Sequence, residues 1–157
     1  MKSKFIISLD FELKWGVFDV LGDEYNKNIL GARMAIPRIL DALEKNNIKA
    51  TWAIVGFLFA SKKEEYIKFK PLLTPSYDKK YLDPYKVEIG ESEDQDKLSY
   101  AGSLVNLIKN TKNQEIASHT YCHYYCTENG QTKLQFENDV SSMASISFDK
   151  VMKPIKS

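Results

Sequence analysis

The stretch Ile116-Ala117-Ser118-His119-Thr120-Tyr121-Cys122-His123 joins a predicted strand to side chains of types that can bind metals. It contains both histidines of the protein, four positions apart. Two imidazoles at that spacing face one point if the backbone turns helically there, and neutral imidazole is the commonest metal ligand among side chains. The stretch therefore predicts part of a metal site directly after a strand.

Apolar patterns on either side of this stretch predict alternating strands and helices. Short apolar runs typical of buried strands occupy residues 4–9, 48–55 and 115–118. Apolar residues at helical spacing predict helices at about 31–46, 57–69 and 98–110, and a fourth after a capping box of Thr132 and Gln135. The expected buried stripes of three helices are Ile36, Ile39, Leu40 and Leu43, then Ala101, Leu104, Val105 and Ile108, then Phe136, Val140, Met143 and Ala144. The alternation predicts an α/β fold, a parallel sheet with covering helices.

The predicted domain organisation is simple. A chain of 157 residues is long enough for one domain with a sizeable core. Residues 70–97 show no period and are interrupted by prolines, so they are expected to form a long irregular loop. The acidic run at 88–96 within this loop is expected to be a solvated face.

Composition argues against several classes of protein. The formal net charge of +1 disfavours a general nucleic-acid binder. The apolar run at 5–9 is too short for the core of a signal peptide, and no run approaches the length of a membrane span. We therefore expect a cytoplasmic protein without nucleic-acid or membrane partners. The two cysteines are expected to be free thiols or metal ligands rather than a disulfide.

Two carboxylates offer the missing part of the metal site. Asp10 and Glu12 follow the first predicted strand, and parallel strands all end at the same edge of a sheet. If residues 10–12 stay extended, both carboxylates project to one side. Two histidines with one carboxylate are a known catalytic zinc set, and bound zinc lowers the pKa of its water toward ~7. A second carboxylate can accept the proton, which predicts hydrolysis of an amide or ester.

Other interpretations of these residues remain open. His119 and His123 fit ordinary surface or core positions, with the acids at the start of a solvated loop. Cys122 and Cys126 with the histidines would make a closed structural zinc site, although Cys122 lies roughly 100° around a helical turn from His123. Among the aromatic residues, Trp15 and Tyr121 are candidates for stacking on a sugar, whereas Trp52 fits core packing inside a strand.

Three motifs resemble the polysaccharide deacetylases, the NodB-homology family of carbohydrate esterases. His119-Thr120-Tyr121-Cys122-His123 is similar to the family's H-[ST]-x-x-H motif. Ser8-Leu9-Asp10-Phe11-Glu12 resembles its first motif, in the form with one residue between the acids, and Lys49-Ala50-Thr51-Trp52-Ala53 resembles its second strand. The resemblance implies a distorted parallel (β/α) barrel. It also implies that Asp10 is the general base, and that Glu12, His119 and His123 bind Zn²⁺ or another divalent metal.

The activity that the resemblance implies is deacetylation of an N- or O-acetylated sugar, a hydrolysis of carbon–nitrogen (non-peptide) bonds in carbohydrate metabolism. The similarity runs over residues 4–149, so we expect residues 1–157 to form a single partial domain of this type. A barrel typically needs ~250 residues, and the chain is expected to be truncated before it can close one. The family's later motifs, including a third histidine that acts as general acid, are absent from the sequence. The alternatives are a catalytically incomplete metal- or sugar-binding fragment and a structural domain without metal.

Overall fold

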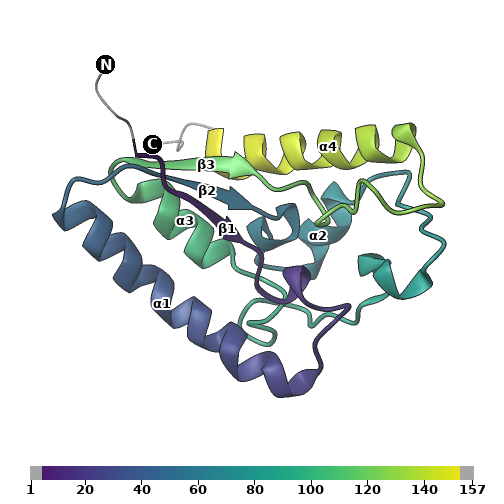
Figure 1. The fold of residues 1–157 in the computed structure, drawn as a ribbon, viewed down its shortest axis with the longest axis horizontal. Coiled ribbons are helices and arrows are strands. Elements are labelled where there is room, and N and C mark those ends of the chain that lie inside the picture. The colour runs from purple at the N-terminus through teal and green to yellow at the C-terminus, as the bar shows by residue number, and fades with distance from the viewer. Residues whose placement is uncertain (1–4, 153–157) are drawn as a thin grey trace.

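The computed structural model of the protein describes residues 5–152 (Figure 1). Its sheet has three strands in the order β1-β2-β3, which are β1 (Ser8–Phe11), β2 (Ala50–Ile54) and β3 (Gln114–Ser118). Both pairs of neighbouring strands are parallel. The predicted α/β class, with a parallel sheet and helices, is confirmed. Because the strands are parallel, their carboxyl ends all lie at one edge.

The first predicted strand is shifted along the chain. Residue 4 lies outside the described residues, and β1 begins only at Ser8. Phe5 and Ile6 are highly exposed, whereas Phe11 is 4% exposed. The strand therefore forms where its apolar residues meet the core, and not where they are densest in the sequence.

In the described part of the chain four α-helices accompany the sheet, α1 (Asn26–Lys45), α2 (Lys63–Phe69), α3 (Gly102–Asn110) and α4 (Lys133–Ser147). Helix α1 begins earlier than predicted and continues through Pro37. The capping box at the start of α4 is confirmed, since Thr132 and Gln135 each bond to the other's backbone. After α4 a π-helical turn, Phe148–Met152, follows. None of the helices in residues 5–152 has both the length and the apolar character needed to cross a bilayer.

The helix predicted at residues 57–69 is wrong in its first half. A 3₁₀ turn, Gly56–Phe59, follows β2, and the backbone is extended at Ala60 and Lys62 before α2 begins. All four residues of the turn are buried. In an α-helix that started here, consecutive residues would face all directions, so every side of the helix would have to be buried. The short 3₁₀ turn buries these four residues, and the chain then returns to the surface.

The two faces of the sheet have different environments. Strand alternation turns Phe11, Trp52 and Ile54 to one face, where all three are buried. The buried residues of α1 and α3 belong to the same core cluster as these three, and Figure 1 shows the two helices on one side of the sheet. The residues of the opposite face are Ser8, Asp10, Thr51, Ala53, Glu115 and Ala117, and none of them is buried. We call these the covered face and the open face.

The helices bury slightly different residues from those predicted. In α1 the stripe is confirmed at Ile36, Leu40 and Leu43, but Ile39 is exposed. The α3 stripe is confirmed at Ala101, Val105 and Ile108, with Leu104 partly buried. In α4 the buried residues are Asp139, Ser142, Met143 and Ile146, whereas Val140 and Ala144 are exposed. The buried side of α4 thus includes a carboxylate.

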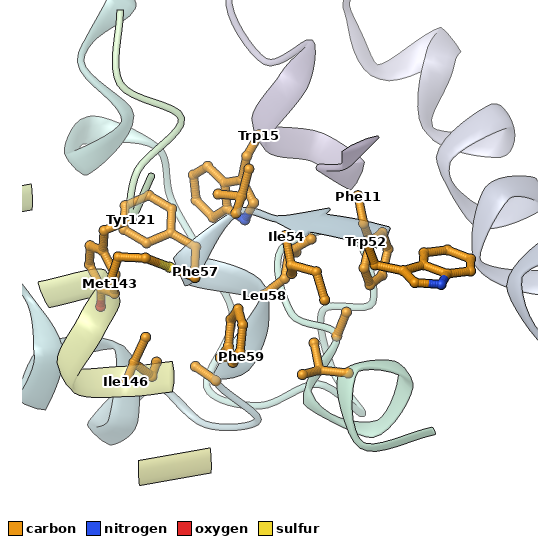
Figure 2. Close-up of a cluster of buried hydrophobic side chains, with 14 of the residues drawn as sticks. Phe11, Trp15, Trp52, Ile54, Phe57, Leu58, Phe59, Tyr121, Met143 and Ile146 are labelled. Atoms are coloured by element: carbon orange, nitrogen blue, oxygen red, sulfur yellow. The ribbon is translucent and has the colours of Figure 1, made fainter. Parts of the chain in front are cut away.

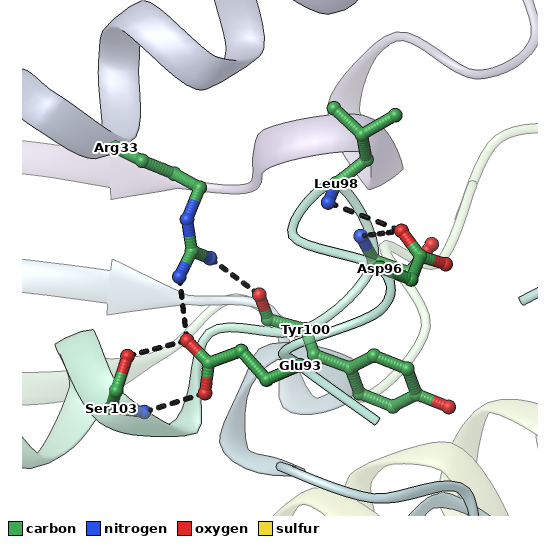
Figure 3. A network of polar contacts seen from close by, with 7 residues as sticks. Arg33, Glu93, Asp96, Leu98, Tyr100 and Ser103 are labelled. Atoms are coloured by element: carbon green, nitrogen blue, oxygen red, sulfur yellow. Dashed lines mark hydrogen bonds and ion pairs between the residues drawn. The ribbon is translucent and has the colours of Figure 1, made fainter. Parts of the chain in front are cut away.

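The long segment 70–101 contains no α-helix or strand and only short 3₁₀ turns. It is nevertheless attached to the rest of the fold (Figure 3). The Arg33 guanidinium of α1 donates to Glu93 and to the carbonyl of Tyr100. Asp96 accepts hydrogen bonds from the backbone N–H groups of Leu98 and Ser99, each at 3.1 Å. The acidic run is therefore only partly the solvated face that was predicted, because two of its carboxylates hold the segment in place.

Candidate metal centre

Three predicted ligands meet at the carboxyl edge of the sheet. Oε1 of Glu12 lies 2.8 Å from Nε2 of His119 and 3.2 Å from Nε2 of His123. The potential ligand atoms of the three residues all lie within 4.8 Å of one another. Tetrahedral zinc with ligands at about 2.0–2.2 Å separates those atoms by roughly 3.4 Å. The triad therefore has the donor types and the spacing to hold a metal ion.

The side chains of the triad are partly exposed to solvent. The side chains of Glu12, His119 and His123 are 27%, 31% and 19% exposed. The hydrogen bond with His123 lowers the pKa of the Glu12 carboxyl, and burial opposes this shift. The carboxylate is therefore kept in the charged form that binds a cation.

Glu12 reaches the histidines because the strand ends before it. Its φ of −126° and ψ of −32° are not those of a strand, and Leu13 has a left-handed φ of 51°. Asp10 and Phe11 are extended in β1 but Glu12 is not, so the condition under which both carboxylates would project to one side is not met. The backbone enters a 3₁₀ turn, Leu13–Gly16, which places Gly16 against the Glu12 side chain. A Cβ at Gly16 would overlap the Glu12 carboxylate, so the absence of a side chain there leaves room for the ligand.

Asp10, the predicted base, lies two residues before Glu12 on the open face of the sheet and is exposed. Among residues 5–152, the side-chain contacts between possible ligands at this site join Glu12, His119 and His123, and none of them involves Asp10. In the sheet register Asp10 is opposite Ala53, which in turn is opposite Ala117. The row beside Asp10 therefore carries only methyl side chains, and the carboxylate remains accessible.

The two histidines lie on an irregular loop and not on a helical turn. Thr120 and His123 have left-handed φ values of 61° and 57°. The Thr120 hydroxyl donates to the carbonyl of His119 at 2.6 Å and accepts from the backbone N–H of Tyr124 at 2.7 Å. The two left-handed residues, and not a helical repeat, bring the imidazoles together, with ring centroids 5.2 Å apart.

Residues at the end of β2 and directly after it form hydrogen bonds with the backbone of this loop. The N–H of His119 donates to the carbonyl of Ile54 at 3.0 Å, and that of Gly56 to the carbonyl of Thr120 at 2.9 Å. The N–H of Phe57 donates to the carbonyl of Tyr121 at 3.0 Å. A Cβ at Gly56 would lie 2.7 Å from the Cα of Tyr121. Gly56 is thus part of the site, and its only signal in the sequence is a glycine directly after a strand.

Trp15 and Tyr121, the predicted sugar-stacking residues, are placed differently by the structure. They are 1% and 0% exposed, so neither ring offers a face to a sugar. Their rings pack against Phe57 at centroid distances of 4.5 and 5.0 Å, and Figure 2 shows the three side chains together. Trp15 follows Glu12 and Tyr121 lies between the histidines, so Phe57 packs under both ligand-bearing segments. Trp52 is buried in the core, as predicted.

The cysteines do not complete a closed zinc site. Cys122 is buried and Cys126 is exposed, and both are free thiols. In the part of the chain that the structure describes, the one group of three or more potential ligands is Glu12, His119 and His123. Burial raises the pKa of the Cys122 thiol well above its usual range, which disfavours the thiolate that binds metals. In this loop the Cys122 side chain points into the core, whereas the two histidine side chains lie at the carboxyl edge of the sheet.

A pocket of about 310 Å³ lies beside the histidines. Its lining combines the two histidines, the small polar residues Ser118 and Thr120, and the larger side chains of Tyr124, Phe136 and Val140. Nδ1 of His123 is buried and has no hydrogen-bond partner among the described residues. An apolar wall with polar groups next to a metal triad is typical of a small-molecule site.

The chain was compared with protein-family models, with curated proteins and with solved structures, and none of the three comparisons found a match.

Proposed function

We propose that the protein is a zinc-dependent hydrolase of the polysaccharide-deacetylase type, which removes the acetyl group from an N- or O-acetylated sugar. The observation that carries the proposal is the convergence of Glu12, His119 and His123. Two imidazoles and one carboxylate are a ligand set of catalytic zinc sites, in which the fourth position stays open. When bound, zinc supplies a Lewis acid for the acyl oxygen and an activated water.

The residues of the chain supply the remaining parts of the proposed site. Asp10 accepts the proton of the attacking water, for which its carboxylate is suitably exposed at the same edge of the sheet. Ala53 and Ala117 leave the space beside it free for the substrate. The pocket lined by Phe136 and Val140 holds part of the substrate, and its volume of about 310 Å³ lies at the lower end of the range for small-molecule sites.

The fold proposed for this function is the first part of a distorted (β/α) barrel. In a barrel the helices lie outside the sheet, and the inner face carries the catalytic groups near the strand ends. The covered and open faces agree with that arrangement, because α1 and α3 lie on one side and Asp10 points to the other.

The second candidate is a metal- or sugar-binding protein without turnover. It is favoured by the assignment of both histidines in the sequence to the triad. No further histidine in the sequence can protonate the leaving group, as the third histidine does in the deacetylase family. Metal binding without hydrolysis needs only the triad.

The test measures zinc content and acetate release from acetylated oligosaccharides. We expect one zinc ion per chain, lost in His119→Ala, and acetate release that falls by about 10²–10⁴-fold in Asp10→Asn while zinc content is unchanged. Asp41→Asn, in an exposed ion pair on α1, is the matched control and should change neither. Zinc binding without acetate release favours the second candidate, and a wild-type chain that takes up no zinc overturns the first candidate and the metal-binding form of the second.

A further inference from the structure

A carboxylate on α4 is sealed inside the protein behind the histidine loop. Asp139 is 0% exposed and lies on the second turn of the helix. Its Oδ2 accepts the backbone N–H of Tyr121 at 2.7 Å, and its Oδ1 accepts that of Cys122 at 3.0 Å. These two residues are consecutive and lie between His119 and His123. One buried side chain therefore binds the backbone of the segment that joins the two histidine ligands.

We infer that Asp139 is the positioning residue of the metal site, and that its carboxylate holds the loop 119–123 in the ligand geometry before any metal binds. For its effect on metal binding the inference rests on the proposed function. The conformation of the loop is a separate property that can be measured without metal.

The backbone of the loop explains why such a carboxylate is needed. Left-handed φ values are unfavourable for residues with a side chain, and Thr120 and His123 both adopt them. The N–H groups of Tyr121 and Cys122 point into the interior, where an unpaired backbone donor is costly. Asp139 accepts both of them, whereas a neutral side chain of the same size offers one acceptor oxygen at most.

The loop is held from two directions. The N–H groups of Gly56 and Phe57 bind the carbonyls of Thr120 and Tyr121 from the end of β2. Asp139 binds the N–H groups of the loop from α4. The segment between the histidines therefore has fixed partners on its carbonyl side and on its N–H side.

The first arm of the test measures zinc affinity. Asp139→Asn keeps the size of the side chain but replaces one acceptor oxygen with a donor, and we expect zinc affinity to fall by about 10–100-fold. The visible spectrum of the Co²⁺-substituted protein should change as well. Ile146→Ala is the matched control, since Ile146 is also 0% exposed on α4. It should lower the melting temperature but leave zinc affinity within about twofold.

The second arm measures amide hydrogen exchange of the metal-free protein. In the wild type the amides of Tyr121 and Cys122 should be protected. In Asp139→Asn they should exchange faster, while the amides of α3 stay protected.

Each outcome bears on the inference. A folded Asp139→Asn that binds zinc as tightly as the wild type overturns it, as do unprotected Tyr121 and Cys122 amides in the metal-free wild type. If Asp139→Asn does not fold, the wild-type exchange decides alone. If the wild type takes up no zinc, the proposed function fails, and the exchange data still decide whether Asp139 holds the loop.

Discussion

Asp10 and Phe11 are neighbours in β1, yet their side chains lie in opposite environments. Phe11 is 4% exposed on the covered face, whereas Asp10 is exposed on the open face beside Ala53. The covered face carries the large apolar side chains that hold the sheet to α1 and α3. The open face carries small and polar ones. A charged group on the open face remains hydrated, so this is where the sheet can carry a carboxylate without burying its charge.

The largest expected contrast in stability lies within this pair. Phe11→Ala should lower the free energy of unfolding by about 3–5 kcal/mol, because it removes a buried ring and leaves a cavity. Asp10→Ala should change it by no more than about 0.5 kcal/mol, as is usual for exposed positions. Urea unfolding of both variants measures the difference. Equal losses would show that the open face is also packed in solution.

The second contrast compares two ion pairs made by the long segment 70–101. Glu93 binds Arg33 of α1 with both side chains 12% exposed, whereas Glu91 pairs with Lys63 at 65% and 37% exposure. Glu93→Gln should cost about 1.5–3 kcal/mol, since it weakens charged hydrogen bonds away from water. Glu91→Gln should cost less than about 1 kcal/mol. Thermal unfolding measures both, and a larger loss for Glu91→Gln would contradict the arrangement in Figure 3.

Lowering the pH should destabilise the folded protein through Asp96, which lies in the same segment. Burial alone would raise the pKa of this carboxyl, but hydrogen bonds from the backbone of Gly90, Leu98 and Ser99 outweigh burial and lower it. Because the pKa is lower in the folded state, the stabilisation is present above the unfolded value of about 3.9 and is lost as pH falls through the folded pKa.

Asp96→Asn tests this pH dependence. At pH 7 the variant should lose about 1–2 kcal/mol of the free energy of unfolding, because a backbone donor loses its acceptor. The difference in this free energy between the variant and the wild type should disappear below about pH 4. Unfolding curves between pH 7 and pH 3 measure it. Asp94→Asn is the matched control, since Asp94 is exposed in the same segment. A gap that stays constant with pH would refute the role of the charge.

The smallest effect is expected on the open face. The Thr51 hydroxyl donates to Glu115 at 2.6 Å across β2 and β3, and Glu115 is exposed. Thr51→Val keeps the shape and the strand preference of the residue, so the free energy of unfolding should change by less than about 0.5 kcal/mol. A loss above 1 kcal/mol in urea unfolding would indicate that this face is shielded from water.

Local patterns in the sequence predicted many parts of the structure. The three apolar runs located the strands to within a few residues, and their alternation with helices predicted the parallel sheet. Parallel order in turn predicted that Glu12 and His119 would meet, since both follow strand ends. The capping box at Thr132 was predicted correctly for a related reason, as its two hydrogen bonds involve residues only three apart.

Other features depend on contacts between distant segments, which no local pattern contains. Trp15 and Tyr121 are residue types that can stack on a sugar, and only the tertiary structure shows that they are buried against Phe57. Asp139 interrupts the predicted apolar stripe of α4, but its partners lie 17 and 18 residues away in the histidine loop.

The sequence by itself determined which residue types are available for the site and which strand ends bring them to one edge. The tertiary structure decided their geometry. Glu12 leaves the strand at a turn that Gly16 makes possible, and the histidines converge through left-handed backbone at Thr120 and His123. Such conformations are unfavourable in isolation and persist only where surrounding contacts hold them. Those contacts, from Gly56, Phe57 and Asp139, exist only once the chain has folded.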